Sequence, residues 1–318
     1  MLLMHLNNNK TSEAPSASDI QRKLTLDERG HPALNGQASW VALGIKIQEI
    51  QYAISLISRC HAYVVCRLAL KYQLRCHERK LNLEEENVFE HKQRRLQALI
   101  DKFEHQADSI ILHQESPELP KISAIGHYGQ FDDFAPMERS ATTAPPVHSR
   151  NLDGSGMDRS DPQGLPILLP STLGWKWCVS HGIVDLAAKE AELRIAQANE
   201  SIHMIRLALG FKSAIFRTQV RSANSQQKKI RAWKNVKSID ATVHEHARIY
   251  SMARDAYEVI RHSLPKQTDL PKLDPSDLHV ATLILGSDKT GQRNLQTSWI
   301  WGFGRTAEDD DTWMNDCK

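Results

Sequence analysis

VDLAAKEAELRIAQANESIHMIRLALGFKSAIFRTQV, residues 184–220, is the stretch that decides the fold class. It contains no proline, and its many Ala, Leu, Ile, Gln and Glu residues are compatible with a helix. Acidic residues cluster early and basic residues late, as the helix macrodipole favours. SANSQ (222–226) predicts a break, and a second proline-free stretch, 230–264, predicts another helix that Pro265 ends. The sequence therefore predicts a helical module over residues 167–264.

A heptad pattern precedes this module. Apolar residues recur at alternating steps of three and four, interrupted only by His61, which is typical of a coiled-coil seam. The first seam comprises Trp40, Leu43, Ile47, Ile50, Ile54, Ile57, Val64 and Leu68, and the second comprises Phe89, Leu96, Leu99, Phe103 and Ile110. One very long helix and a hairpin both fit. A hairpin lets the seams bury each other within one chain, so we predict an antiparallel coiled-coil hairpin over residues 37–116.

The remaining segments lack such periodicity. Residues 1–36 are polar and predict a disordered N-terminus. Residues 117–166 hold seven of the thirteen prolines and five of the fifteen glycines, which predicts a disordered linker. Residues 265–318 predict an irregular tail rich in aromatic and acidic residues. The expected class is all-α: a long coiled-coil hairpin, then a C-terminal helical bundle.

Composition excludes several classes of protein. The chain has 41% hydrophobic and 25% charged residues and a net charge of +2, as in an ordinary soluble protein. No apolar run is long enough to span a membrane, and no secretory signal is present, so we expect a nuclear or cytoplasmic location. Five cysteines without a C-x-x-C spacing predict neither a disulfide framework nor a metal site.

Residues 280–293, VATLILGSDKTGQR, superficially resemble a phosphate-binding loop. Such a loop needs a lysine directly after its second glycine and a hydroxyl residue after the lysine. Here Gln292 and Arg293 follow that glycine, so we predict a simple turn and no nucleotide cofactor.

Catalytic patterns are weak elsewhere in the chain. His244 and His246 lie on different faces of the predicted helix, and metal chelation by the pair is not expected. Ser171, His181 and Asp185 are close in sequence, but no glycine-rich turn frames the serine as a nucleophile. We therefore predict no catalytic residue, no cofactor and no enzymatic activity.

The strongest signal is a basic segment. Between His203 and Lys237 there are nine lysines or arginines and no aspartate or glutamate. Such a surface repels itself unless polyanions or counterions neutralise it, which favours contact with nucleic-acid phosphates. Trp233 would stack on an exposed base. The predicted phosphate contacts are Arg206, Lys212, Arg217, Arg221, Lys228, Lys229, Arg231, Lys234 and Lys237.

A simpler interpretation of this segment stays open. The basic residues would form a solvated face, with Trp233 in the core and the arginines paired to acids such as Glu190, Glu192 or Asp240.

Several long motifs carry a family resemblance: LPSTLG (169–174), ELRIAQANESIHMIRLALGFKSAIFRTQVR (192–221), RAWKNVKSIDATVHEHARIYSMARDA (231–256) and GQRNLQTSWIW (291–301). In this order they resemble the C-terminal region of fungal Kyakuja–Dileera–Zisupton (KDZ) transposases. The resemblance implies descent from a mobile element, a nuclear setting and association with DNA. The cysteine cluster and nuclease acids of these transposases lie upstream of this region, and no matching motif is present here.

These observations lead to two functional hypotheses. The first is a non-catalytic, transposase-derived module that binds DNA without sequence specificity. The second is a structural module that self-associates, as a homo-oligomer or with an intact transposase. Its predicted contacts are Ile47, Ile50, Ile54 and Ile57.

Overall fold

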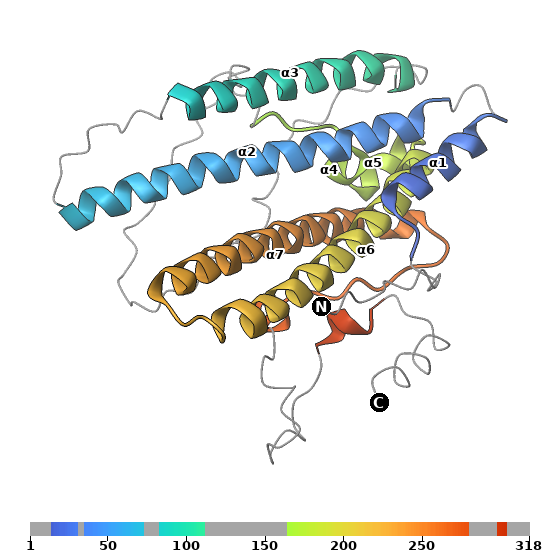
Figure 1. Ribbon diagram of the computed structural model, residues 1–318. Coiled ribbons are helices and arrows are strands. Elements are labelled where there is room, and N and C mark those ends of the chain that lie inside the picture. Colours follow the sequence, from blue (N-terminus) through green and yellow to red (C-terminus); the bar gives the residue numbers. More distant parts are fainter. Residues whose placement is uncertain (1–13, 31–34, 73–82, 112–163, 280–297, 304–318) are drawn as a thin grey trace. The chain divides into compact units, whose positions relative to one another are not determined.

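The computed structural model describes residues 14–30, 35–72, 83–111, 164–279 and 298–303, and every regular element within these ranges is helical. The α-helices are α1 (Ala17–Glu28), α2 (Gln37–Tyr72), α3 (Leu83–Ile111), α4 (Pro170–Leu173), α5 (Trp175–Ser180), α6 (Val184–Ile215) and α7 (Gln226–Ile260) (Figure 1). A π-helix, η3 (Phe216–Val220), continues α6, and 3₁₀ turns occupy Arg261–Ser263, Pro275–Leu278 and Trp299–Trp301. The predicted all-α class is confirmed. Among the described helices, none combines the length and apolar character that a membrane span requires.

The contacts within the chain divide it into two compact units. Of the described residues, 24–30, 35–72, 83–111 and 164–190 belong to one unit, and 14–23, 191–279 and 298–303 belong to the other. The sequence predicted a boundary in the linker at 117–166, whereas the described residues 164–190 belong to the unit of α2 and α3. The predicted start of the C-terminal module at residue 167 therefore differs from the structure.

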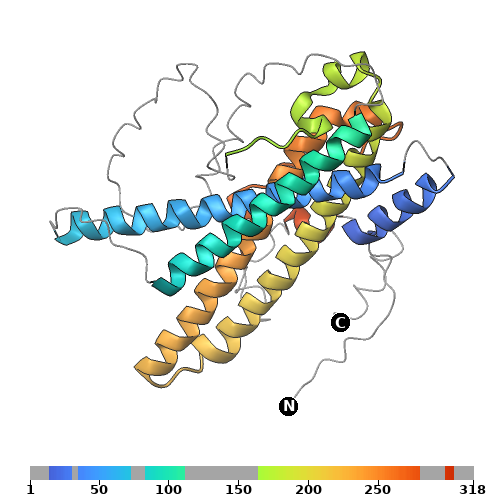
Figure 2. The ribbon, with the colours of Figure 1, turned by 90° about the horizontal axis from the view of Figure 1, so that it is seen from above.

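Helices α2 and α3 run in opposite directions, and α3 crosses α2 obliquely (Figure 2). The Trp40 ring stacks on Phe103 with centroids 4.5 Å apart, and its Nε1 donates to the Phe103 carbonyl at 3.0 Å. Among the predicted self-association residues, Ile47 and Ile54 are buried and Ile50 is half-buried. The side chain of Ile57 lies outside the described residues. Self-association through this seam stays a prediction, but it would have to replace contacts that the single chain already makes.

Residues 164–169 pack against α2 because of two local features. The Gln51 side-chain nitrogen donates to the Leu165 carbonyl at 2.7 Å. Gly44 lets the chain approach closely, since a Cβ there would lie 2.7 Å from a ring carbon of Phe103 and 2.8 Å from a methyl of Leu169. These contacts join residues far apart in the sequence, which is why the sequence pattern placed the boundary elsewhere.

Helix α1 lies within residues 1–36, for which the sequence predicted disorder. Its last residue, Glu28, is only 2% exposed, and the bonds of its carboxylate attach α1 to the start of α2 and to Lys189. The carboxylate accepts the backbone N–H of Gly36 at 2.9 Å and of Ala38 at 2.7 Å, and pairs with Lys189 at 2.7 Å. Acceptance of two amides at the start of α2 is the favourable position for a carboxylate. A single anchoring acid leaves no periodic signal, so the sequence prediction missed this helix.

In the other unit, α6 from residue 191 onward, η3 and α7 form a helical hairpin, drawn in yellow and orange in Figure 1. The predicted break at 222–226 is the turn of this hairpin. Ser225 is the N-cap of α7, because its hydroxyl accepts the backbone N–H of Lys228 at 3.3 Å. The helix ends at Ile260, shortly before Pro265, as predicted.

Candidate nucleic-acid interface

Three contacts fix the far end of the hairpin. Lys212 Nζ lies 2.5 Å from Asp240 Oδ1, the Phe216 and Trp233 rings meet edge to face at 5.6 Å, and Asn235 Nδ2 donates to Gln219 Oε1 at 3.0 Å. Along the first arm the contact residues are 212, 216 and 219, in increasing order. Their partners on α7 are 240, 233 and 235, so the partner nearest the start of the pairs has the highest residue number. The two helical arms are therefore antiparallel, and residues before and after the turn lie side by side.

The π-helix η3 shapes the end of the first arm. The backbone N–H of Arg221 bonds to the carbonyl of Phe216 at 3.1 Å, five residues back rather than four. This extra residue per turn changes the register of the side chains that follow α6. Short π-helical segments are frequent at functional sites. Here the segment carries Arg217 and the aromatic ring of Phe216 to the end of the hairpin.

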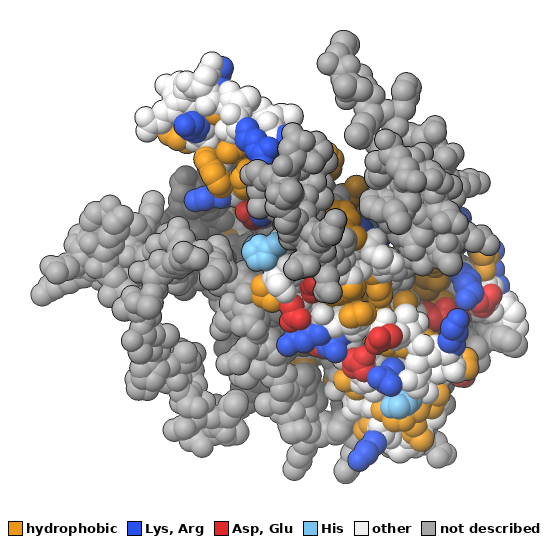
Figure 3. Space-filling view, turned by 90° about the horizontal axis from the view of Figure 1, so that it is seen from below, with side chains coloured by type: hydrophobic (Ala, Val, Ile, Leu, Met, Phe, Trp, Pro, Cys, Tyr) orange, Lys and Arg blue, Asp and Glu red, His pale blue; other side chains and the backbone are white. Residues whose placement is uncertain are grey.

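Seven of the nine predicted phosphate contacts are exposed at this end. We call them the basic tip: Arg217, Arg221, Lys228, Lys229, Arg231, Lys234 and Lys237. In Figure 3 the end of the hairpin, at the upper left, shows several blue basic side chains, and red acidic atoms are visible only at its lower edge. The sequence agrees, since no aspartate or glutamate occurs between Glu200 and Asp240. The segment that forms the tip therefore concentrates positive charge and contributes no acidic residue of its own.

The cations on α7 share one outward face. At about 100° per residue, Arg231, Lys234 and Lys237 span roughly 120° of the helix circumference. Ala232 and Val236 lie on the opposite side and are each 2% exposed. Burial of the small apolar residues against the rest of the hairpin thus forces these three cations toward solvent.

Arg206 and Lys212 are engaged within the protein. Arg206 Nε donates to the Ile300 carbonyl at 2.5 Å, and a second guanidinium nitrogen donates to the Phe303 carbonyl. Lys212 pairs with Asp240 and is only 20% exposed. Phosphate contact by either residue would disrupt these bonds, so the interface that we consider below rests on the basic tip alone.

Two cations of the basic tip bond to neutral groups nearby in the sequence. Arg217 donates to the Ser213 hydroxyl at 3.1 Å, and Lys228 donates to the Asn224 side-chain oxygen at 3.0 Å. Neutral partners hold a side chain in place but leave its charge uncompensated.

The acids that the simpler interpretation assigned to the arginines have other partners. Glu192 pairs with Lys23 at 3.4 Å, and Glu190 accepts the hydroxyl of Ser171 at 2.6 Å. Trp233, which that interpretation placed in the core, is 48% exposed. Asp240 pairs with Lys212, which is one of the predicted phosphate contacts.

The other constellations considered from the sequence have structural roles. The hydroxyl of Ser171 donates to Glu190, while His181 stacks on Trp177 with centroids 4.0 Å apart. Burial raises the pKa of the Cys178 thiol to about 11, which keeps it protonated and unreactive. Within the described ranges, no group of three His, Cys, Asp or Glu residues is placed to hold a metal ion.

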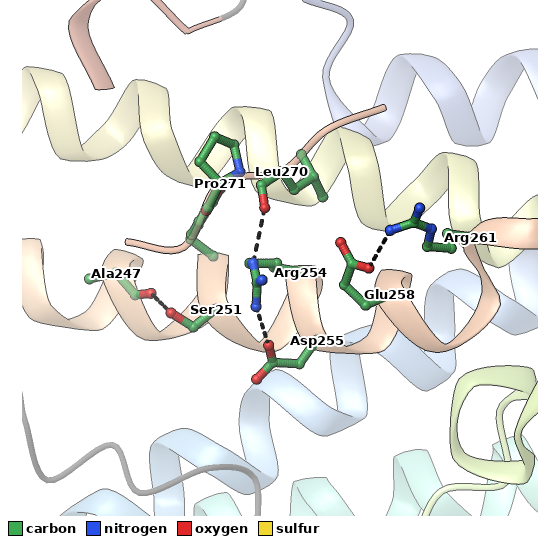
Figure 4. A network of polar contacts seen from close by, with 9 residues as sticks. Ala247, Ser251, Arg254, Asp255, Glu258, Arg261, Leu270 and Pro271 are labelled. Carbon is green, nitrogen blue, oxygen red and sulfur yellow. Dashed lines mark hydrogen bonds and ion pairs between the residues drawn. The ribbon is translucent and has the colours of Figure 1, made fainter. Parts of the chain in front are cut away.

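A polar network on α7 holds the segment that follows it (Figure 4). Arg254 Nε donates to the Leu270 carbonyl at 2.9 Å, and the same guanidinium pairs with Asp255 at 3.0 Å. One turn earlier, the Tyr250 hydroxyl donates to the Pro271 carbonyl at 2.6 Å. These groups satisfy backbone carbonyls of the returning chain, so we assign the network to stability.

Sequence reasoning missed the contribution of Phe216 and Ile230 to this surface. Phe216 meets Trp233 across the turn, and Ile230 is 61% exposed between basic neighbours. Helical periodicity counts both as core residues, and only the register across the turn shows that they lie at the tip.

The loop-like stretch 280–293 lies outside the described residues. In comparisons with known proteins, no family model, no curated protein and no solved structure matches the chain. The resemblance to KDZ transposases therefore stays a prediction from the sequence motifs.

Proposed function

We propose that this protein binds nucleic acid through the basic tip, by contacts to the phosphate backbone that do not read the sequence. The observation that carries the proposal is the concentration of seven exposed cations with no acidic residue among them. Neutralisation of phosphates by such residues releases condensed counterions, which drives non-specific binding. A dissociation constant on the order of 10⁻⁴ to 10⁻⁶ M at physiological salt is typical of this mode.

Several amide side chains at the tip are engaged within the protein, which favours binding without sequence preference. Asn and Gln read adenine when both their donor and acceptor are available. At the tip, Asn235 is bonded to Gln219, and the Asn224 side-chain oxygen accepts from Lys228. Contacts to phosphate by Lys and Arg position a protein on nucleic acid but carry no sequence information.

The motifs that resemble KDZ transposases support a finer proposal. The basic tip falls inside the resembling segment, residues 165–316. We therefore propose that the chain is a transposase-derived, non-catalytic module that acts on DNA in the nucleus. This part rests on the sequence resemblance alone, whereas the proposal of phosphate binding rests on the exposed charges.

Charge reversal in the full chain tests phosphate binding. Arg217→Glu with Arg221→Glu should abolish binding to labelled DNA measured by fluorescence anisotropy. The matched control is Lys92→Glu with Arg95→Glu, two exposed residues on α3. Each pair lowers the formal net charge from +2 to −2, because each reversal changes it by two. The control should bind nearly as well as wild type.

Salt titration of the wild-type chain supplies an independent criterion. Six or more phosphate contacts should cost on the order of a thousandfold in affinity between about 50 and 200 mM salt. Equal losses in the tip and control pairs would show that only net charge matters, and would contradict a site at the tip. Absence of binding at low salt would leave the tip as a solvated face.

A further inference from the structure

We infer that the nucleic acid at the basic tip is single-stranded and that Trp233 stacks on one of its unpaired bases. This inference rests on the proposed function and names the form of nucleic acid that the same surface takes.

Trp233 is unlike the other tryptophans that the structure describes. Trp40 is 1% exposed in the core, and Trp299 is fixed by an Nε1 bond to Asp277 at 3.0 Å. Trp233 is 48% exposed, and among the described tryptophans it alone is classed as exposed. A large aromatic ring in water among cations offers stacking area that the fold does not use.

The orientation of the Trp233 ring is set in advance by Phe216. The two rings meet at an interplanar angle of 86°, with centroids 5.6 Å apart. Aromatic pairs prefer this edge-to-face arrangement. A ring that is already held loses less conformational freedom when a ligand binds, which favours stacking on it.

The neighbours of Trp233 supply the other contacts that a single strand needs. Ile230 precedes it by three residues and Lys237 follows it by four, so all three lie on one side of α7. At about 100° per residue, Lys234 lies next to this side, whereas Arg231 lies farther round the helix. The surface therefore alternates a stacking ring, an aliphatic contact and cations, the combination by which proteins bind single strands without sequence preference.

A duplex would use this surface less well. In a duplex the base faces are covered by neighbouring base pairs, and only the base edges are open in the grooves. Trp233 would then meet sugar and phosphate, and its ring would gain no stacking partner. Stacking of an unpaired base on an aromatic side chain is worth roughly a fivefold to hundredfold gain in affinity.

An anionic lipid surface is the competing ligand for an aromatic residue among cations. Attachment to lipid scales with the apolar area that is inserted. On α7 at the tip, Ile230 and Trp233 are the large apolar side chains described as exposed. Two separate side chains surrounded by charge offer little area for insertion, so single-stranded nucleic acid is favoured.

The test compares Trp233→Leu, which keeps an apolar side chain but removes the ring, with Trp233→Phe, which keeps a ring. Full chains are titrated with labelled 20-nucleotide oligo(dT), 20-nucleotide oligo(U) and a 30-base-pair DNA duplex. We expect wild type to bind a single strand at least tenfold more tightly than the duplex. Trp233→Leu should lose fivefold or more on that strand and change duplex affinity less than twofold, whereas Trp233→Phe should keep most of the preference.

Each result bears on the inference. Tighter binding of oligo(dT) or of oligo(U) identifies DNA or RNA as the ligand, and either supports it. Equal affinity of wild type for strands and duplex, or an unchanged strand affinity in Trp233→Leu, would overturn it while the charge-reversal result still stands. Trp233-dependent binding to phosphatidylserine vesicles without a strand preference would replace it with a lipid surface. If the wild-type chain binds none of the nucleic acids at low salt, the proposed function fails and the inference fails with it.

Discussion

Gly44 and Gly210 both lie inside long helices, where glycine normally costs about 1 kcal/mol relative to alanine. Their surroundings differ. A Cβ on Gly44 would clash with Phe103 and Leu169, which are both buried and cannot easily move aside. A Cβ on Gly210 would meet nothing within 4 Å. Addition of one methyl group therefore affects both packing and helix propensity at Gly44, but only helix propensity at Gly210.

We predict opposite effects of the same substitution at these positions. Gly44→Ala should lower the melting temperature, because overpacking costs about 1–3 kcal/mol and outweighs the gain in propensity. Gly210→Ala should raise it, by an increase of about 0.5–1 kcal/mol in the free energy of unfolding. Thermal unfolding followed by circular dichroism checks both variants. Shifts in the same direction would contradict the close packing at Gly44.

At the scale of an element, the segment after α7 is held by side chains of that helix rather than by secondary structure of its own. Leu270 and Leu273 are buried, and the carbonyls of Leu270 and Pro271 accept bonds from Arg254 and Tyr250. Burial raises the pKa of the Tyr250 phenol, so the hydroxyl stays a neutral donor throughout the accessible pH range. The segment is therefore a strap whose attachment depends on a few bonds.

Tyr250→Phe should weaken this strap. Removal of the hydroxyl removes the bond to the half-buried Pro271 carbonyl, which costs about 0.5–1.5 kcal/mol. We expect a lower urea midpoint and faster backbone hydrogen exchange across residues 266–273, with little change at the basic tip. Exchange that speeds up equally at both places would indicate general destabilisation instead.

How far these elements could be predicted depended on their length and on where their partners lie. Helices α6 and α7 follow from long proline-free patterns, and the break at 222–226 was found because Ser and Asn interrupt them. Helix α1 was missed because Glu28 holds it through residues farther along the chain. Exposure of the basic residues from Arg217 to Lys237 was predictable from composition. The engagement of Arg206 was not, because its carbonyl partners lie more than ninety residues away.

At the scale of the whole molecule, two half-buried histidines make stability depend on pH. Burial lowers the pKa of His244, and the nearby Arg248 charge lowers it further. Burial also lowers the pKa of His246, against the opposing charges of Glu245 and Glu200. The folded protein therefore favours neutral imidazoles, whereas the unfolded chain protonates them at the usual pKa of about 6.5.

Stability should fall as the pH is lowered through this window. Below about pH 6.5 the unfolded chain binds more protons than the folded one, so the free energy of unfolding decreases from pH 7 toward pH 5. The double variant His244→Gln, His246→Gln should show a smaller decrease. Urea unfolding at pH 7, 6 and 5 measures both slopes. An identical slope in the variant would assign the pH dependence to other groups.

The buried contact between Glu28 and Lys189 also sets an order in time. The two residues are 161 positions apart, so a ribosome that adds roughly 5–20 residues per second finishes the first on the order of ten seconds before the second. During this interval α1 and α2 are synthesised, but the ammonium that neutralises the Glu28 carboxylate does not yet exist. Gln51 is likewise synthesised before Leu165, whose carbonyl accepts the bond from the Gln51 side chain. The N-terminal helices therefore complete their packing late in synthesis: α3 can cover part of α2 earlier, but the surfaces that contact residues 165–190 stay open until those residues are made.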